Sequence, residues 1–232
     1  MSGNRREQGG SRMLHTRVKT ARGRKSSSTR WLQRQLNDPY VALAQRMGLR
    51  SRAAFKLREL NERFHLLAPG QRVVDLGCAP GGWTQVAVEA VRPEAAGGRV
   101  VGIDLLPMDP VPGAETLVMD FTAPDTPERL HALLDGPADV VLSDMAANTT
   151  GHGPTDHLRI VALLEMAYDF ACEVLVPGGA FVAKVFQGGA EGEILARMKR
   201  DFAEVRHAKP PASRKGSAEV YVVATGFRRE RP

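Results

Sequence analysis

The residues best suited to chemistry follow the first predicted strand, in the loop Gly77-Cys78-Ala79-Pro80-Gly81-Gly82-Trp83. This loop lies between an apolar run at residues 72–77 and a predicted helix through Val86, Val88 and Val91. Glycines in such a position let the backbone approach a ligand closely and turn sharply into the helix. The loop has neither the GxGxxG spacing nor a P-loop lysine, which disfavours a phosphate-binding loop. A tight turn that binds nothing is the alternative interpretation of this loop taken alone.

Acidic residues end the next two predicted strands. Asp104 ends the run at 99–104, where an ionised carboxylate can accept hydrogen bonds from both hydroxyls of a ribose. Asp120 ends the run at 116–120 and precedes Phe121, a pair suited to an adenine amino group and its ring. Acids at strand ends often cap helices instead. Three successive strands that end in glycine or aspartate are better explained by a cofactor that contains adenosine.

A lysine interrupts a later apolar strand. Lys184 stands in the run Ala180-Phe181-Val182-Ala183-Lys184-Val185-Phe186, and a buried lysine needs a partner or a function. No metal chemistry is indicated, because the six histidines lack metal-ligand spacing and neither Cys78 nor Cys172 has a CxxC partner. Covalent catalysis by a cysteine likewise has little support in the sequence.

The elements that must position these residues alternate between strand and helix. A helix with Ser51 as its N-cap is predicted before the first strand, and the longest helix spans residues 156–175 and stops at Pro177-Gly178-Gly179. The last two strands, near 204–207 and 219–225, have no obvious helix between them, so we expect an antiparallel member at the sheet edge. The pattern predicts a doubly wound α/β domain, with helices on both faces of a mostly parallel sheet and the ligand at the carboxyl ends of its strands.

Composition adds a basic tail to this single domain. The 232 residues carry a formal net charge of +6, and residues 1–30 contain nine arginines and lysines against one acid, Glu7. We therefore expect a disordered basic tail over 1–30 and one domain over 31–232. The tail could be solvated, contact RNA or serve as a transit peptide. Two cysteines, no apolar run of about 20 residues and no secretory signal favour a cytoplasmic protein without a membrane segment.

The glycine-rich loop resembles the cofactor loop of the FtsJ/RrmJ family of ribose 2′-O-methyltransferases. Further segments match the family in order: Ser51–Leu57, Leu142–Ala146, Phe181–Gly188, Lys209–Arg214 and Ser217–Tyr221. The similarity extends over roughly residues 31–227, and it implies a Rossmann-like class I fold with a seven-stranded sheet and S-adenosylmethionine as cofactor. Cys78, in place of a small apolar residue, and a longer stretch at 93–99 are departures from the family pattern.

The resemblance implies a catalytic tetrad of Lys56, Asp144, Lys184 and Glu219. We expect Lys184 to act as the base or to orient the ribose hydroxyl, with Asp144 orienting Lys184 and facing the positive charge of the cofactor. Lys56 would position the ribose or its phosphate, and Glu219 would hold the lysines. The expected cofactor-binding residues are Gly77, Pro80, Gly81, Gly82, Trp83, Asp104, Asp120, Phe121 and Asp144.

The family resemblance also implies an RNA substrate. The expected RNA-binding cations are Arg50, Arg52, Arg58, Lys209, Arg214 and Lys215, although basic helix faces are often only solvated surface. The resemblance favours methylation of a uridine ribose in 23S ribosomal RNA, within the large ribosomal subunit, by a monomer. Methylation of tRNA and a non-catalytic role in ribosome assembly are the alternatives.

Overall fold

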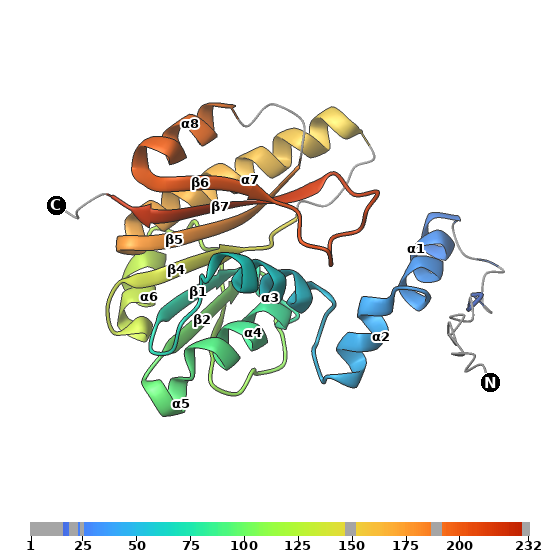
Figure 1. The fold of residues 1–232 in the computed structure, drawn as a ribbon, viewed down its shortest axis with the longest axis horizontal. Helices are drawn as coiled ribbons and strands as arrows, with labels where there is room; N and C mark the ends of the chain where they lie inside the picture. The colour runs from blue at the N-terminus through green and yellow to red at the C-terminus, as the bar shows by residue number, and fades with distance from the viewer. Residues whose placement is uncertain (1–15, 19–22, 24–25, 147–151, 187–191, 229–232) are drawn as a thin grey trace, which may run out of the picture.

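The computed structural model of the protein describes residues 16–18, 23, 26–146, 152–186 and 192–228. At its centre is a seven-stranded sheet of order β3-β2-β1-β4-β5-β7-β6 (Figure 1). The strands are β1 (Arg72–Leu76), β2 (Arg99–Asp104), β3 (Glu115–Val118), β4 (Ala138–Ser143), β5 (Leu175–Phe186), β6 (Phe202–Ala208) and β7 (Glu219–Phe227). The helices are α1 (Ser26–Leu36), α2 (Pro39–Arg46), α3 (Ala53–Phe64), α4 (Gly82–Val91), α5 (Pro93–Ala96), α6 (Thr126–Leu134), α7 (Gly153–Val174) and α8 (Gly192–Asp201). The predicted fold class is confirmed.

Two hydrophobic cores cover the two faces of the sheet. Successive residues of β1 point in opposite directions, so Val73 packs in the core with α3 and α4, and Val74 packs in the core with α6, α7 and α8. The buried pattern of β1 reflects this double coverage, which is typical of parallel strands between helical layers. Within the described residues, no helix is long and apolar enough to cross a membrane.

The antiparallel strand lies inside the sheet and not at its edge. β7 pairs antiparallel with β5 on one side and with β6 on the other, so β6 is the edge strand. The prediction of an antiparallel member is therefore confirmed, but its predicted position at the edge is wrong. The connection between β6 and β7 is long enough for β7 to enter between its two neighbours.

Two local predictions also need correction. The segment Pro177-Gly178-Gly179 does follow the end of α7, but it belongs to β5, where the register against β4 shifts between Ala138 and Val140. Gly178 lies in this irregular stretch with φ +85°, a left-handed backbone conformation that glycine adopts without strain. Ser51 is not the cap of α3, because Arg52 occupies the N-cap position without a capping side-chain hydrogen bond.

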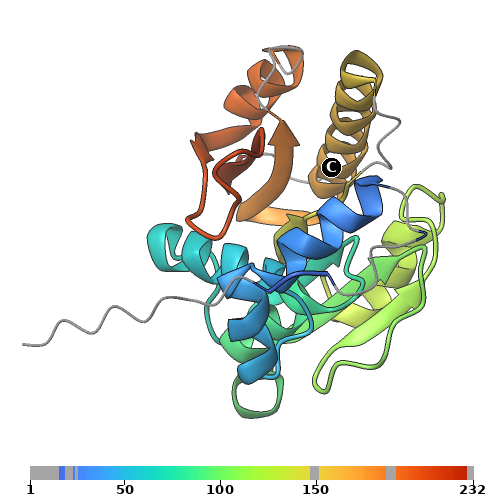
Figure 2. The same cartoon turned by 90° about the vertical axis from the view of Figure 1, so that its right-hand side faces the viewer.

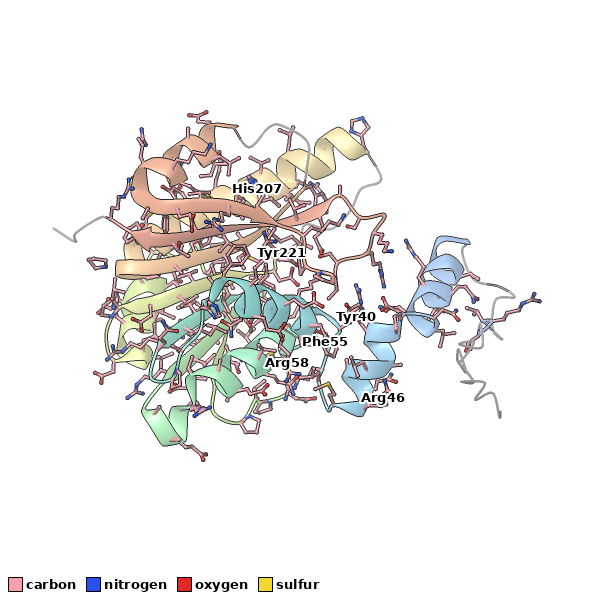
Figure 3. The ribbon with its side chains drawn as sticks, viewed as in Figure 1. Tyr40, Arg46, Phe55, Arg58, His207 and Tyr221 are labelled. Carbon is pink, nitrogen blue, oxygen red and sulfur yellow. The ribbon has the colours of Figure 1, made fainter. Side chains whose placement is uncertain are left out.

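Helices α1 and α2 lie to one side of the sheet, near the segment that joins β6 to β7 (Figures 1 and 2). The predicted domain boundary at residue 31 falls inside α1, which begins at Ser26. The first fifteen residues of the predicted tail lie outside the described residues. Tyr40 on α2 packs on Phe55 of α3 with ring centroids 5.4 Å apart, which joins these helices to the domain (Figure 3).

Gly102 of β2 makes room for the unusual cysteine of the glycine-rich loop. A Cβ atom at Gly102 would lie 2.8 Å from Cys78 Sγ and 2.9 Å from Cys78 Cβ. Gly102 lies in a buried strand and Cys78 in a buried loop, so neither backbone can move away easily. The cysteine side chain at position 78 therefore requires a residue without a side chain at position 102.

We expect Gly102→Ala to lower the free energy of unfolding by about 1–3 kcal/mol, because the added methyl group overpacks this contact. Urea unfolding of the variant and the parent protein measures the loss. Gly192→Ala is the control, since nothing lies within 4 Å of a Cβ there and Gly192 is exposed in α8. Equal stability of Gly102→Ala and Gly192→Ala would contradict the prediction.

Candidate active site

Four ionisable side chains meet at the carboxyl ends of the central strands. Asp144 directly follows β4, and Lys184 lies near the end of the neighbouring strand β5. β7 begins with Glu219, and its antiparallel register places Tyr221 opposite Lys184. Lys56 reaches the same place from α3. The structure thus brings together all four residues of the predicted tetrad.

Asp144 is the point that the two lysines share. Lys184 Nζ donates to the backbone oxygen of Asp144 at 2.6 Å and lies 3.2 Å from its Oδ1. Lys56 Nζ lies 3.7 Å from Asp144 Oδ2 and 2.9 Å from Glu219 Oε1. Both lysine side chains are less than a tenth exposed, so these ion pairs are far less screened than pairs at the surface.

Tyr221 completes the cluster, and sequence reasoning gave it no role. Its hydroxyl accepts from Lys56 Nζ at 2.9 Å and donates to Asp144 Oδ1 at 2.7 Å. Ser213 Oγ donates to Glu219 Oε1 at 2.9 Å. The signal for Tyr221 was its position two residues after Glu219, on the same side of the predicted strand. Ser213 lies in a loop and carries no comparable periodicity.

The surroundings fix the protonation of two members of the cluster. Burial raises the pKa of Tyr221 well above its ordinary value, and the carboxylates of Asp144 and Glu219 raise it further. The phenol therefore stays protonated and can donate to Asp144. Burial would raise the pKa of Glu219, but the Lys56 charge and hydrogen bonds from Lys56 and Ser213 lower it overall. Glu219 is consequently a carboxylate at neutral pH.

A cavity of about 480 Å³ adjoins the cluster through Asp144. Gly77, Asp104, Asp120, Phe121 and Asp144, five of the nine predicted cofactor residues, line it. The remaining wall is mostly apolar and comes from side chains that sequence reasoning missed, among them Leu105, Leu106, Met119, Met145, Leu163 and Met166. An apolar pocket with a few converging polar groups is the usual form of a site for a nucleoside-like ligand.

The acids of this cavity also hold its walls. Asp104 Oδ2 accepts from the backbone N–H of Ala79 at 2.9 Å, and its Oδ1 accepts from that of Leu106 at 2.8 Å. Asp120 Oδ1 accepts from the backbone N–H and hydroxyl of Thr122, and these bonds lower the pKa of Asp120. An ionised carboxylate offers about four acceptor positions, so both acids keep capacity for ligand hydroxyl or amino groups.

The other four predicted cofactor residues lie outside this cavity. Pro80 lines a neighbouring cavity, and Gly81 adopts φ +105° at the N-cap of α4. A Cβ at Gly82 would lie 2.2 Å from Ser51 Oγ, so Gly82 permits close packing of α3 and α4. Trp83 is buried, and its Nε1 donates to the Ala53 backbone oxygen at 2.8 Å. In this structure these residues shape the loop and do not line the cavity.

Most of the predicted RNA-binding cations have partners within the protein. Arg52 and Arg214 both form ion pairs with Asp38, at 2.9 and 3.2 Å, which ties α2 to the segment between β6 and β7. Arg58 pairs with Glu89 of α4 at 2.5 Å. These pairs would weaken the arginines as phosphate ligands, because each already meets a carboxylate.

The remaining predicted cations differ from one another. Arg50 donates to the Pro80 backbone oxygen, and Lys209 Nζ donates to the Ser217 backbone oxygen at 2.5 Å. Lys215 is exposed, and among the described residues its ammonium group has no ion-pair or hydrogen-bond partner; its backbone oxygen lies 3.5 Å from Lys209 Nζ. Of the six, Lys215 therefore presents its charge most openly.

A buried acid beneath the cavity has a different character. Asp75 of β1 accepts from Thr84 Oγ1 at 2.7 Å through Oδ2, while Oδ1 has no hydrogen-bond partner among the described residues. Burial raises the pKa of Asp75 to about 7, and the nearby carboxylates of Asp144 and Asp104 add to this. The carboxyl is therefore partly protonated near neutral pH.

Known proteins resemble this chain over nearly all of its length. The profile of the FtsJ-like methyltransferase family matches residues 49–227. "Ribosomal RNA large subunit methyltransferase E" of Paramagnetospirillum magneticum is 68% identical over 223 residues, which cover 95% of this chain and 91% of that protein. The protein of the same name from Azorhizobium caulinodans is 64% identical over 217 residues, 94% of this chain and 90% of that protein.

A solved structure agrees with these sequence relationships. The crystal structure of a Plasmodium falciparum protein described as a ribosomal RNA methyltransferase superposes with a TM-score of 0.70 at 29% identity. The match covers 78% of this chain and all of that chain. The residues that the family profile matches, 49–227, include all seven strands and the four residues of the cluster.

We expect Glu219→Gln to lower the free energy of unfolding at pH 7 by about 1–3 kcal/mol, because Lys56 loses its nearest counter-charge. The pKa of Glu219 is lowered in the folded state, so its contribution is present above 4.5 and is lost as the pH falls through the lowered value. Urea unfolding at pH 7 and below pH 4 should give a difference that shrinks in acid. A difference that stays constant with pH would contradict this account.

Asp75→Asn should change the pH dependence in the opposite sense. Because the folded pKa of Asp75 is raised from 3.8 to about 7, ionisation destabilises the fold progressively as the pH rises through this range. Asparagine removes that slope, so the variant should gain stability relative to the parent protein between pH 5 and pH 8, by up to about 4 kcal/mol. Unfolding curves at both pH values test this, and parallel pH profiles would refute it.

Proposed function

Because this chain belongs to the FtsJ-like methyltransferase family, we propose that it transfers a methyl group from S-adenosylmethionine to a ribose 2′-hydroxyl in large-subunit ribosomal RNA. The observation that carries the proposal is the buried cluster of two lysines and two carboxylates, which borders the cavity through Asp144. The names of the relatives support a large-subunit ribosomal RNA target. A uridine in 23S RNA is the finer expectation from the family resemblance.

The cavity suits the cofactor in its size and its chemistry. Asp104 and Asp120 offer acceptors for ribose hydroxyls and an adenine amino group, and Phe121 offers an aromatic surface beside them. Asp144 places a carboxylate where a sulfonium charge would need a counter-charge. Bound there, S-adenosylmethionine would supply an electrophilic methyl carbon for in-line displacement.

The protein then has to place a ribose hydroxyl and manage its proton. Lys184 Nζ donates to the backbone oxygen of Asp144 and lies in ion-pair range of its carboxylate, so the rest of the amine can face the substrate hydroxyl. We assign Lys184 to orient this hydroxyl and, in its neutral amine form, to take the hydroxyl proton on the amine lone pair during transfer and become the ammonium. Lys56 is surrounded by Glu219, Tyr221 and Asp144, which suits a role in holding Asp144 and Glu219 more than direct contact with a phosphate.

Charge distribution along the chain suits an RNA substrate. Residues 1–50 contain twelve arginines and lysines against two acids, a net +10 by difference, whereas residues 51–232 contain twenty against twenty-four, a net −4. Long-range attraction to RNA would therefore come mainly from the N-terminal fifty residues, with Lys215 adding an exposed charge in the segment between β6 and β7. Contacts from Arg50, Arg52, Arg58, Lys209 and Arg214 would compete with their partners in the protein. For a ribosomal target we propose a cytoplasmic location.

The direct test is transfer of radiolabelled methyl from S-adenosylmethionine to purified large ribosomal subunits and to bulk tRNA. We expect label in large-subunit RNA at a ribose that resists alkaline cleavage. Lys184→Met should lower the rate of methyl transfer by about 100-fold or more, because general acid–base groups contribute on this scale. Lys199→Met is the matched control, since Lys199 is exposed on α8, away from the cluster.

Each alternative has its own outcome in the same assay. Label in tRNA would keep the reaction and replace the substrate. Cofactor binding without label in either RNA would favour the non-catalytic role in ribosome assembly. Equal activity of Lys184→Met and Lys199→Met would remove Lys184 from the mechanism.

A further inference from the structure

Arg50 lies in the short link between α2 and α3, beside the glycine-rich loop. Its backbone N–H donates to Gln85 Oε1 at 2.8 Å, and Gln85 Nε2 donates to the Gly48 backbone oxygen at 3.1 Å. The link is therefore fastened to α4, the helix that the glycine-rich loop opens. This attachment fixes where the Arg50 side chain begins.

The guanidinium group of Arg50 joins two loops that are far apart in sequence. Nη1 donates to the backbone oxygen of Pro80 at 3.3 Å and also to that of Asp109, and Nη2 donates to that of Pro110 at 2.6 Å. Pro80 belongs to the glycine-rich loop, whereas Asp109 and Pro110 belong to the loop between β2 and β3. Three carbonyl oxygens thus converge on one cation.

Gly81 allows this close approach. A Cβ at Gly81 would lie 3.0 Å from both Cδ and Nη1 of Arg50, and 3.0 Å from Val111 Cγ2. With φ +105°, Gly81 also adopts a backbone conformation that suits glycine. The glycine therefore serves the arginine contact as well as the turn.

The same two loops form one wall of the cavity. Ala79 of the first loop and Leu106 of the second both line the cavity beside Asp144, and both line the neighbouring cavity that includes Arg50. Asp104 bonds the backbone of both loops from within, through Ala79 and Leu106. Arg50 joins them from the other cavity, so the wall is held on two sides.

The second loop carries two apolar side chains that are largely exposed. Leu105 and Leu106 are 70% and 65% exposed, although both line the cavity. Exposed leucines gain stability when a ligand covers them. Ligand affinity would therefore depend on how far Leu105 and Leu106 lie from the glycine-rich loop.

We propose that Arg50 is a positioning residue for the cofactor, which it serves by holding the loop of Leu105 and Leu106 against the glycine-rich loop. This inference rests on the proposed use of S-adenosylmethionine. It differs from the sequence-based expectation that Arg50 contacts RNA phosphates, because its guanidinium donors already meet backbone oxygens. The planar fork of arginine can meet three acceptors at fixed angles, which the compact ammonium of lysine cannot do as well.

The experiment compares Arg50→Met, Arg50→Lys and the charge-matched control Arg129→Met, which changes an exposed arginine on α6. Calorimetric titration with S-adenosylmethionine and filter binding of large-subunit RNA over a range of salt are measured for each, below the unfolding transition. We expect Arg50→Met to raise the Kd for the cofactor by about tenfold or more. Arg50→Lys should recover part of the affinity, and Arg129→Met should match the parent protein.

RNA binding distinguishes positioning from phosphate contact. If Arg50 positions the loops, the RNA affinity of Arg50→Met and its salt slope equal those of Arg129→Met. Unchanged cofactor affinity overturns the inference, whether or not RNA affinity falls. A salt slope smaller by about one, with cofactor affinity intact, would identify Arg50 as a phosphate contact. Absence of cofactor binding in the parent protein would overturn the proposed function and this inference together.

Discussion

The site depends on placing two lysines and two carboxylates together where little water reaches them. A buried ion without a counter-charge is strongly destabilising, and each ion of this cluster has one. Asp144 meets both lysines, while Tyr221 ties Asp144 to Lys56 through a protonated phenol. The side chains therefore hold one another in position before a substrate arrives. Such preorganisation is what orientation of a hydroxyl toward a methyl donor requires.

The antiparallel direction of β7, between β5 and β6, helps to bring these charged side chains together. A parallel strand beside β5 would bring its last residues to the catalytic edge of the sheet. Because β7 runs the other way, its first residues, Glu219 and Tyr221, reach that edge directly after the loop that contains Ser213. That loop is held in turn by the ion pair of Arg214 with Asp38. The N-terminal helices are thus coupled to the position of the carboxylate of Glu219.

Local patterns predicted the fold class and marked Lys184, because a strand-loop-helix alternation and a lysine within an apolar strand are visible in the sequence. The full tetrad came from the family resemblance. Partners across long separations were not predictable. Nothing near Arg52 or Arg214 indicates that both meet Asp38, which precedes Arg214 by 176 positions. The position of β7 inside the sheet had no local signal either, since strand order depends on packing of the whole chain. Basic residues that were predicted as RNA ligands therefore also serve as internal ties, and their contact with RNA stays a prediction.

The glycine-rich loop illustrates how a motif can mark a site without lining it. Gly81 and Gly82 admit Arg50 and Ser51 at close range, and Trp83 anchors α4 to α3 through Ala53. The cavity itself is lined more by apolar residues of other segments than by the motif. Substitutions at the motif should therefore act through the placement of backbone atoms, and the chemical selectivity of the cavity should reside in Asp104, Asp120 and the apolar wall. We therefore expect cofactor affinity to depend on α3 and its preceding link as much as on the loop that carries the recognisable sequence.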